Sequence, residues 1–165
     1  MKIEIRNVKH YPDLSEETEA FSADLLIDGK RIGSVSNRGT GGGDDFHGDH
    51  AAYDAADRWL RANRPGWSLE PDCPPDRMMP HTVEDEVSSI LAKLIGMKQM
   101  AKDLRSNLIF RREGEAGLYT IRVRAPHKPT DPAVQARLIA TYPGATILNA
   151  LPIEEAWTIY SECSE

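Results

Sequence analysis

The sequence has little of several features that would classify a protein at once. Its two cysteines, Cys73 and Cys163, lie far apart, which excludes a disulfide framework and a local zinc-binding motif. No apolar run approaches the roughly 20 residues that a membrane-spanning helix needs. The first ten residues alternate and carry charge, so they lack the apolar core of a signal peptide. These absences predict a cytoplasmic protein with free thiols and no membrane partner.

An excess of basic residues is also missing. The chain has 20 Lys and Arg against 26 Asp and Glu, a formal net charge of −6, whereas nucleic-acid binders are usually basic. Direct nucleic-acid binding is therefore allowed but not favoured. A hairpin predicted at 108–124 nevertheless carries a candidate basic patch of four arginines, Arg111, Arg112, Arg122 and Arg124. Such a patch could bind phosphates or an acidic protein surface, although the solvated face of a sheet explains it more simply.

What the chain does have is the patterning of an α+β protein. Its 165 residues suffice for one compact domain, or for one domain with a small lobe. Alternation predicts strands and apolar stripes predict helices: strands at 2–9, 19–27, 30–36, 108–112, 118–124 and 145–151, and helices at 50–63, 83–107, 131–142 and 152–162. We therefore expect an N-terminal three-stranded antiparallel meander plus a helix, a long central helix, and a C-terminal ββαβα lobe. Five prolines in 64–81 separate a first half, 1–63, from a second half, 82–165.

Short local signals support these elements. Asp28-Gly29 predicts a tight hairpin turn, because both residues tolerate positive φ. Asp49 is well placed to cap the helix that follows it, and Thr82 with Asp85 forms a variant of the capping box. Gly96 costs the long helix about 1 kcal/mol relative to alanine, which predicts a close packing contact at that position.

The most unusual stretch runs from Ser36 to His50, SNRGTGGGDDFHGDH. Its fifteen residues hold five glycines, three aspartates and two histidines, a concentration of backbone freedom and ligand-type side chains found nowhere else in the chain. We expect an exposed, flexible loop. Its candidate binding residues are Gly41, Gly42, Gly43, Asp44, Asp45 and His47.

Four interpretations of this loop remain open. A glycine-rich turn before a helix can cradle a phosphate, but no Lys-Ser/Thr pair follows the glycines, and three aspartates would repel the anion. A zinc or manganese ion is the second option, with candidate ligands Asp45, His47, Asp49 and His50, although no distant cluster completes the shell. The third is docking on another macromolecule, where glycines allow close approach and acids pair with basic groups. The fourth is a solvated connection.

Nothing in the sequence specifies a reaction. No serine lies in a nucleophile-elbow pattern, and neither cysteine has a histidine partner nearby in the sequence. We expect no catalytic residue and no cofactor, with a divalent metal in the loop as the exception. The sequence therefore favours a binding protein over an enzyme.

Four segments of the sequence carry a family resemblance. They are the opening MKIEIRNVKH, then SEETEAFSADLLIDGKRIGSVSN before the GTGGG loop, KQMAKDLRSNLIFRREGEAGLY, and ATILNALPIEEAW. Together they make the chain resemble a family of small uncharacterised proteins of bacteriophages and mobile elements. The resemblance supplies no catalytic residue to transfer.

The resemblance implies a biological context. Small acidic accessory proteins of phages often inhibit host defence by binding a protein surface. The expectation is thus a non-enzymatic protein of the host bacterial cytoplasm that binds a host defence protein or nucleoprotein complex, for example as an anti-CRISPR. One alternative is a metal-dependent or nucleotide-binding enzyme that uses residues 39–50. Another is a phage structural or assembly component.

Overall fold

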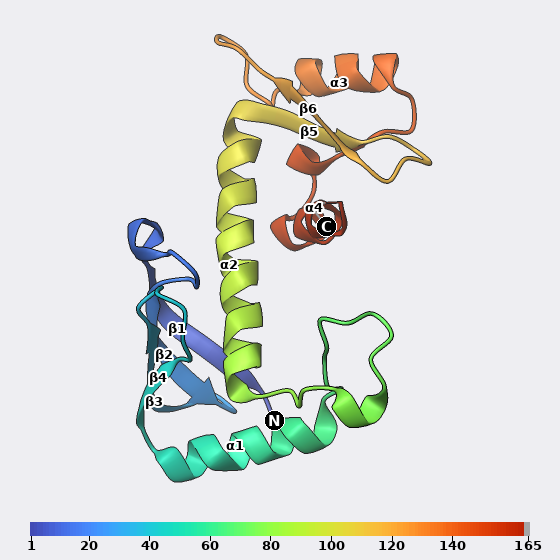
Figure 1. Cartoon of the computed structure of the whole chain (residues 1–165). Helices are drawn as coiled ribbons and strands as arrows, with labels where there is room; N and C mark the ends of the chain where they lie inside the picture. Colours follow the sequence, from blue (N-terminus) through green and yellow to red (C-terminus); the bar gives the residue numbers. More distant parts are fainter. Residues whose placement is uncertain (164–165) are drawn as a thin grey trace. The chain divides into compact units, whose positions relative to one another are not determined.

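The computed structural model describes residues 1–163 and has an α+β fold (Figure 1). The chain divides into two compact units, Met1–Ala92 (unit 1) and Lys93–Glu165 (unit 2). The helices and strands are β1 (Ile3–His10), β2 (Phe21–Ile27), β3 (Lys30–Asn37), β4 (Asp45–Gly48), α1 (His50–Asn63), α2 (Val83–Ser106), β5 (Asn107–Arg111), β6 (Leu118–Arg122), α3 (Pro132–Thr141), β7 (Thr146–Ile147) and α4 (Ile153–Glu162). Among the described residues, no helix is long and apolar enough to cross a membrane.

Unit 1 is built on an antiparallel sheet in the order β1-β2-β3-β4. Asp28 and Gly29 connect β2 to β3 with φ of 48° and 79°, the positive values of a tight hairpin turn, so that prediction is confirmed. The predicted three-stranded meander is corrected to four strands. The sequence pattern did not predict β4, because glycine and aspartate are poor strand formers. However, Phe46 lies opposite Val35, and β3 supplies the pairing partner for its backbone.

The core of unit 1 combines alternate strand residues with one stripe from α1 and one from the start of α2. Its buried side chains include Ile3, Ile5, Phe21, Ala23, Leu25, Val35, Ala56, Leu60, Val83, Val87 and Leu91. The predicted helix at 50–63 is confirmed at both ends. Asp49 caps it as predicted, because its carboxylate accepts a hydrogen bond of 3.0 Å from the backbone N–H of Ala52.

α2 is the longest helix, and its start is capped as the sequence predicts. Thr82 Oγ1 accepts a hydrogen bond of 3.2 Å from the backbone N–H of Asp85, and Asp85 Oδ2 accepts one of 2.8 Å from the backbone N–H of Thr82. The pair satisfies two amides that a helix start leaves free. Further along α2, a Cβ at Gly96 would overlap the ring of Trp157. The predicted close contact is therefore confirmed.

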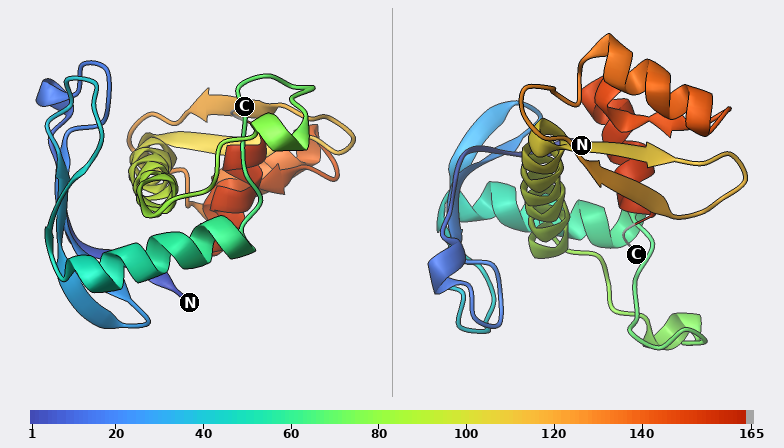
Figure 2. Two further views of the ribbon diagram at one scale, coloured as in Figure 1. Left: turned by 60° about the horizontal axis from the view of Figure 1, so that its bottom comes forward. Right: turned by 90° about the horizontal axis from the view of Figure 1, so that it is seen from above.

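Unit 2 has a three-stranded antiparallel sheet with β5 in the centre, between β6 and β7 (Figure 2). Successive side chains of β5 point to opposite faces. Leu108 and Phe110 pack with Leu138 of α3, whereas Ile109 packs with Ala156 of α4. Figure 1 shows α3 and α4 on opposite sides of the sheet. β5 is buried on both faces for this reason.

The last predicted strand, at 145–151, is mostly wrong. Only β7 pairs with β5, and Leu148–Ala150 turns into a short 3₁₀ helix. The side chain of Asn149 replaces the missing strand pairing. Its Oδ1 accepts a hydrogen bond from the backbone N–H of Ile109, and its Nδ2 donates to the carbonyls of Leu104 and Asn107, all at 2.9 Å. The chain turns toward α4 with these backbone groups satisfied.

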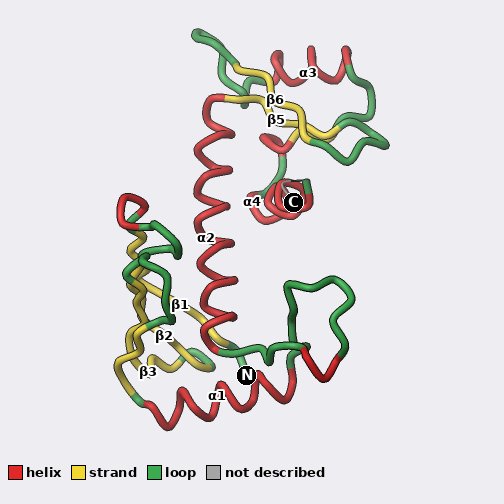
Figure 3. Tube along the Cα trace, in the orientation of Figure 1, coloured by secondary structure: helices red, strands yellow, loops and turns green. Residues whose placement is uncertain are grey.

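The proline-rich segment 64–81 is mainly loop, as predicted (Figure 3). It contains one 3₁₀ turn, Pro75–Arg77. Trp67 and Met79 exchange both of their backbone hydrogen bonds, at 2.9 and 2.8 Å. These two bonds close the segment on itself.

Candidate functional site: the glycine loop and the start of α2

Asn37, the last residue of β3, holds the glycine loop, which we define as residues 38–44. Its Oδ1 accepts hydrogen bonds from the backbone N–H of Gly39 (2.9 Å) and from the hydroxyl of Thr18 (2.8 Å). Its Nδ2 donates to the carbonyl of Gly42 and to Asp44 Oδ1, both at 3.0 Å. One side chain therefore ties both arms of the loop together.

Gly39 provides a second anchor through its backbone. Its carbonyl accepts hydrogen bonds from the backbone N–H groups of Glu16, Glu17 and Thr18, at 2.9, 2.9 and 3.3 Å. Gly39 has a φ of 85°, and a Cβ there would overlap the carbonyl of Leu14, so only glycine fits. The loop is thus more constrained than its glycine content predicts.

Asp44 is the inward-facing acid of the loop. Its backbone N–H donates a hydrogen bond of 3.0 Å to Glu84 Oε1 at the start of α2. Burial raises the pKa of the Asp44 carboxyl to about 6, the hydrogen bond from Asn37 lowers it, and the charges of Glu84 and Asp45 raise it. Its Oδ2 is buried and finds no hydrogen-bond partner within residues 1–163. Asp44 is therefore a structural residue rather than a contact residue.

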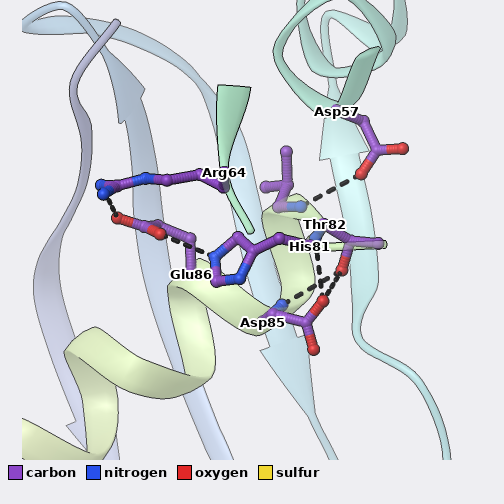
Figure 4. Close-up of polar contacts among 7 residues, drawn as sticks. Asp57, Arg64, His81, Thr82, Asp85 and Glu86 are labelled. Carbon is purple, nitrogen blue, oxygen red and sulfur yellow. Dashed lines mark hydrogen bonds and ion pairs between the residues drawn. The ribbon is translucent and has the colours of Figure 1, made fainter. Parts of the chain in front are cut away.

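The acids at the start of α2 have further structural roles (Figure 4). Glu86 pairs with His81 at 2.9 Å and with Arg64 at 3.3 Å. Asp57 of α1 accepts a hydrogen bond of 3.1 Å from the backbone N–H of Val83. The ion pair of Glu86 with Arg64 and the contact of Asp57 with Val83 could not be predicted from the sequence, because the partners are distant along the chain.

An aromatic contact lies behind the loop. The rings of Phe46 and Tyr53 are 4.6 Å apart between centroids. Burial raises the pKa of the Tyr53 phenol to about 12, and nearby acids that include Asp57 and Glu84 act in the same direction. Tyr53 is therefore a neutral phenol at physiological pH.

The four candidate metal ligands do not converge. Asp45 lies 3.9 Å from Arg38, and Asp49 is committed to the helix cap. His47 lies opposite Ser34 on the outer face of the sheet, whereas the ring of His50 rests edge-on against Phe46, 5.3 Å away. Over the described part of the chain, no three His, Cys, Asp or Glu side chains are grouped to hold a metal ion.

The exposed residues of the loop tip, of β4 and of the segment that hydrogen-bonds to Gly39 form a rim, which we call the acidic rim. Gly41, Gly42 and Gly43 are exposed at the tip, and His47 is exposed on β4. The exposed acids of the rim are Glu16, Glu17 and Asp45. Of the predicted binding residues, Asp44 alone is drawn inward.

The candidate basic patch is split. Arg111 pairs with Glu162 at 3.5 Å. The guanidinium of Arg112 lies 4.1 and 4.4 Å from the ring centroids of Tyr119 and Tyr142 and pairs with Glu115, so it is part of the packing. Arg122 and Arg124 are exposed at the end of β6.

No protein-family model, curated protein or solved structure matches the chain in our comparisons.

Proposed function

We propose that this is a non-enzymatic binding protein that docks its glycine loop and acidic rim on a basic surface of another protein. One observation carries the proposal. Hydrogen bonds from Asn37 and Gly39 hold the backbone of the loop, while the tip glycines and the rim acids face outward. A loop that is ordered before binding loses less conformational entropy when it docks.

The charge distribution indicates the kind of partner. Unit 1 holds 18 Asp and Glu against 10 Lys and Arg, a balance of −8. Complementary charge increases the rate of encounter and selects the partner. The exposed glycines allow the partner backbone to approach closely. A surface rich in Lys and Arg, such as the nucleic-acid channel of a nucleoprotein complex, fits this rim.

The strand beside the loop extends the same surface. β4 is an edge strand, and β3 is its one strand neighbour in the sheet that the structure describes. A free strand edge offers backbone groups to another chain. We propose that the loop tip and this strand edge contact the same partner.

The biological context follows from the family resemblance. We infer a phage or mobile-element accessory protein that binds a host defence protein or nucleoprotein complex, with CRISPR inhibition as one form. The rival enzyme hypothesis needs Asp45, His47, Asp49 and His50 to act together, and their separate roles give it no support. An assembly component would self-associate, so a stable monomer in light scattering would count against that alternative.

The experiment compares three forms of the protein as bait in nuclease-treated host lysate. The test variant is Glu16→Lys/Asp45→Lys, which reverses two exposed rim charges. Asp44 is left intact because a lysine there would lose the hydrogen bond from Asn37 that holds the loop. The matched control is Glu70→Lys/Asp72→Lys, which makes the same charge change at exposed positions of the proline-rich segment.

The expected result is a specific host polypeptide that the unmodified protein and the control capture and that the rim variant does not. Equal capture by the rim variant would assign the contact to another surface. Failure of the unmodified protein to capture a specific polypeptide would contradict the proposal as a whole.

A further inference from the structure

Unit 2 contains a groove between the end of β6 and the first turns of α3. Its volume is about 610 Å³, within the range of roughly 300–1,000 Å³ that small ligands occupy. The cationic and imidazole groups that line it are Arg122, Arg124, His127 and Arg137. Val123 and Val134 contribute an apolar wall. Three of the four polar side chains come from residues 122–127 and the fourth comes from α3, so the fold brings the helix beside this run.

The arginines of this groove differ from Arg111 and Arg112 of the same unit, whereas Arg105 of α2 likewise has no carboxylate partner among the described residues. Arg111 and Arg112 have carboxylate partners, whereas within residues 1–163 no carboxylate pairs with Arg122, Arg124 or Arg137. Asp131 is the nearby acid in the sequence, at the start of α3. Its carboxylate accepts a hydrogen bond of 2.7 Å from the backbone N–H of Lys128. The groove therefore keeps its positive charge.

We propose that this groove binds the phosphodiester backbone of single-stranded nucleic acid. A guanidinium presents a planar fork of donors that matches phosphate oxygens. Arg122 ends β6 and Arg124 lies two residues further along the chain, so both guanidinium groups line the same stretch of the groove. The positive end of the α3 dipole adds to the same field.

A cavity beside the groove is the proposed binding site for a base of the nucleic-acid strand. It has a volume of about 310 Å³ and shares Val134 and Arg137 with the groove. Ile121 and Tyr142 also line it, and its walls are mainly apolar. Cationic groups beside an apolar recess are what a nucleotide needs, because phosphate and base require opposite surroundings. An acidic peptide would use the arginines but would leave the recess unfilled.

The net charge of the chain does not oppose this inference. The acids are concentrated in unit 1, whereas unit 2 has 10 Lys and Arg against 8 Asp and Glu. Arg122, Arg124 and Arg137 gather in one groove, which suits a single strand better than the wide phosphate surface of a duplex. The inference goes beyond the proposed docking function and uses a different unit.

The test is fluorescence anisotropy of a short labelled oligo(dT), measured between roughly 50 and 200 mM salt. The groove variant is Arg124→Gln/Arg137→Gln. The matched control is Arg58→Gln/Arg77→Gln, which removes two exposed and unpaired arginines of unit 1. Circular dichroism melting establishes that each form is folded. An unlabelled duplex and a poly-glutamate peptide serve as competitors.

We expect the groove variant to bind on the order of tenfold more weakly with a shallower salt dependence, and the control to stay within about twofold of the unmodified protein. Equal losses in both variants, or no binding at the lowest salt, would overturn the inference. Competition by the duplex or by poly-glutamate as effective as that by the single strand would also overturn it. The rim variant Glu16→Lys/Asp45→Lys retains the groove, so failure of the docking proposal is distinguishable from failure of this one.

Discussion

Replacing Asp44 by asparagine tests whether the loop is held as described. Asp44 is partly buried, its Oδ2 has no hydrogen-bond partner among the described residues, and burial raises its pKa from 3.8 to about 6. The whole shift in pKa corresponds to a free-energy cost of about 3 kcal/mol for the ionised form in the folded protein. Because water partly reaches the carboxyl, we expect an effect on stability of about 1–2 kcal/mol. The ionised form is therefore a cost to folding at neutral pH.

The pH dependence follows from the direction of this shift. Between about pH 4 and 6 the folded carboxyl holds a proton that the unfolded chain releases, so the folded state binds more protons. The contribution of Asp44 to stability is favourable at low pH and is lost as pH rises through about 6. An asparagine side chain at this position would keep an acceptor for Asn37 and would add a donor beside Glu84.

Urea unfolding of Asp44→Asn and the unmodified protein at pH 7.5 and 5.5 measures this effect. We expect the variant to be about 1–2 kcal/mol more stable at pH 7.5, with a smaller difference at pH 5.5. The control Asp45→Asn, whose side chain is 57% exposed, should change stability by less than about 0.5 kcal/mol. A destabilised Asp44→Asn, or a difference that does not change with pH, would refute the reasoning.

Two further predictions concern packing in unit 2. Gly96→Ala should lower the free energy of unfolding by about 1–2 kcal/mol in urea unfolding, because the new methyl group overlaps Trp157. The gain in helix propensity offsets only part of that cost. Gly117→Ala is the control, since nothing lies within 4 Å of a Cβ added there. Asn149→Ala should cost about 3 kcal/mol by thermal unfolding, since three backbone groups lose their partner, and a loss below about 1 kcal/mol would show that water replaces the side chain.

Patterns that depend on near neighbours in the sequence predicted much of the fold. The helix at 50–63, its cap at Asp49, the hairpin turn at Asp28-Gly29 and the capping pair of Thr82 and Asp85 are all local, and each is present. Gly96 was informative for a related reason, because an unfavourable residue in a helix indicates a contact that requires it. Local physical chemistry suffices for such features.

Features that depend on distant partners were missed. β4 exists because β3 lies beside it, and its own residues do not favour a strand. The shortened β7 reflects the side chain of Asn149, which contacts backbone more than forty residues away. In the candidate site, Glu84 holds Asp44 from forty positions along the chain. The sequence therefore identified the loop but did not reveal which of its acids faces inward.

The most direct test of the central claim is photo-crosslinking from the loop tip. Gly42 is exposed with no atom within 4 Å of an added Cβ, so a photoreactive phenylalanine analogue fits there, and Gly117 of unit 2 offers the same freedom as a control position. We expect that, in host cells, position 42 crosslinks to one host polypeptide and position 117 does not. Absence of a crosslink from position 42, or equal crosslinking of that polypeptide from both positions, would contradict docking through the glycine loop.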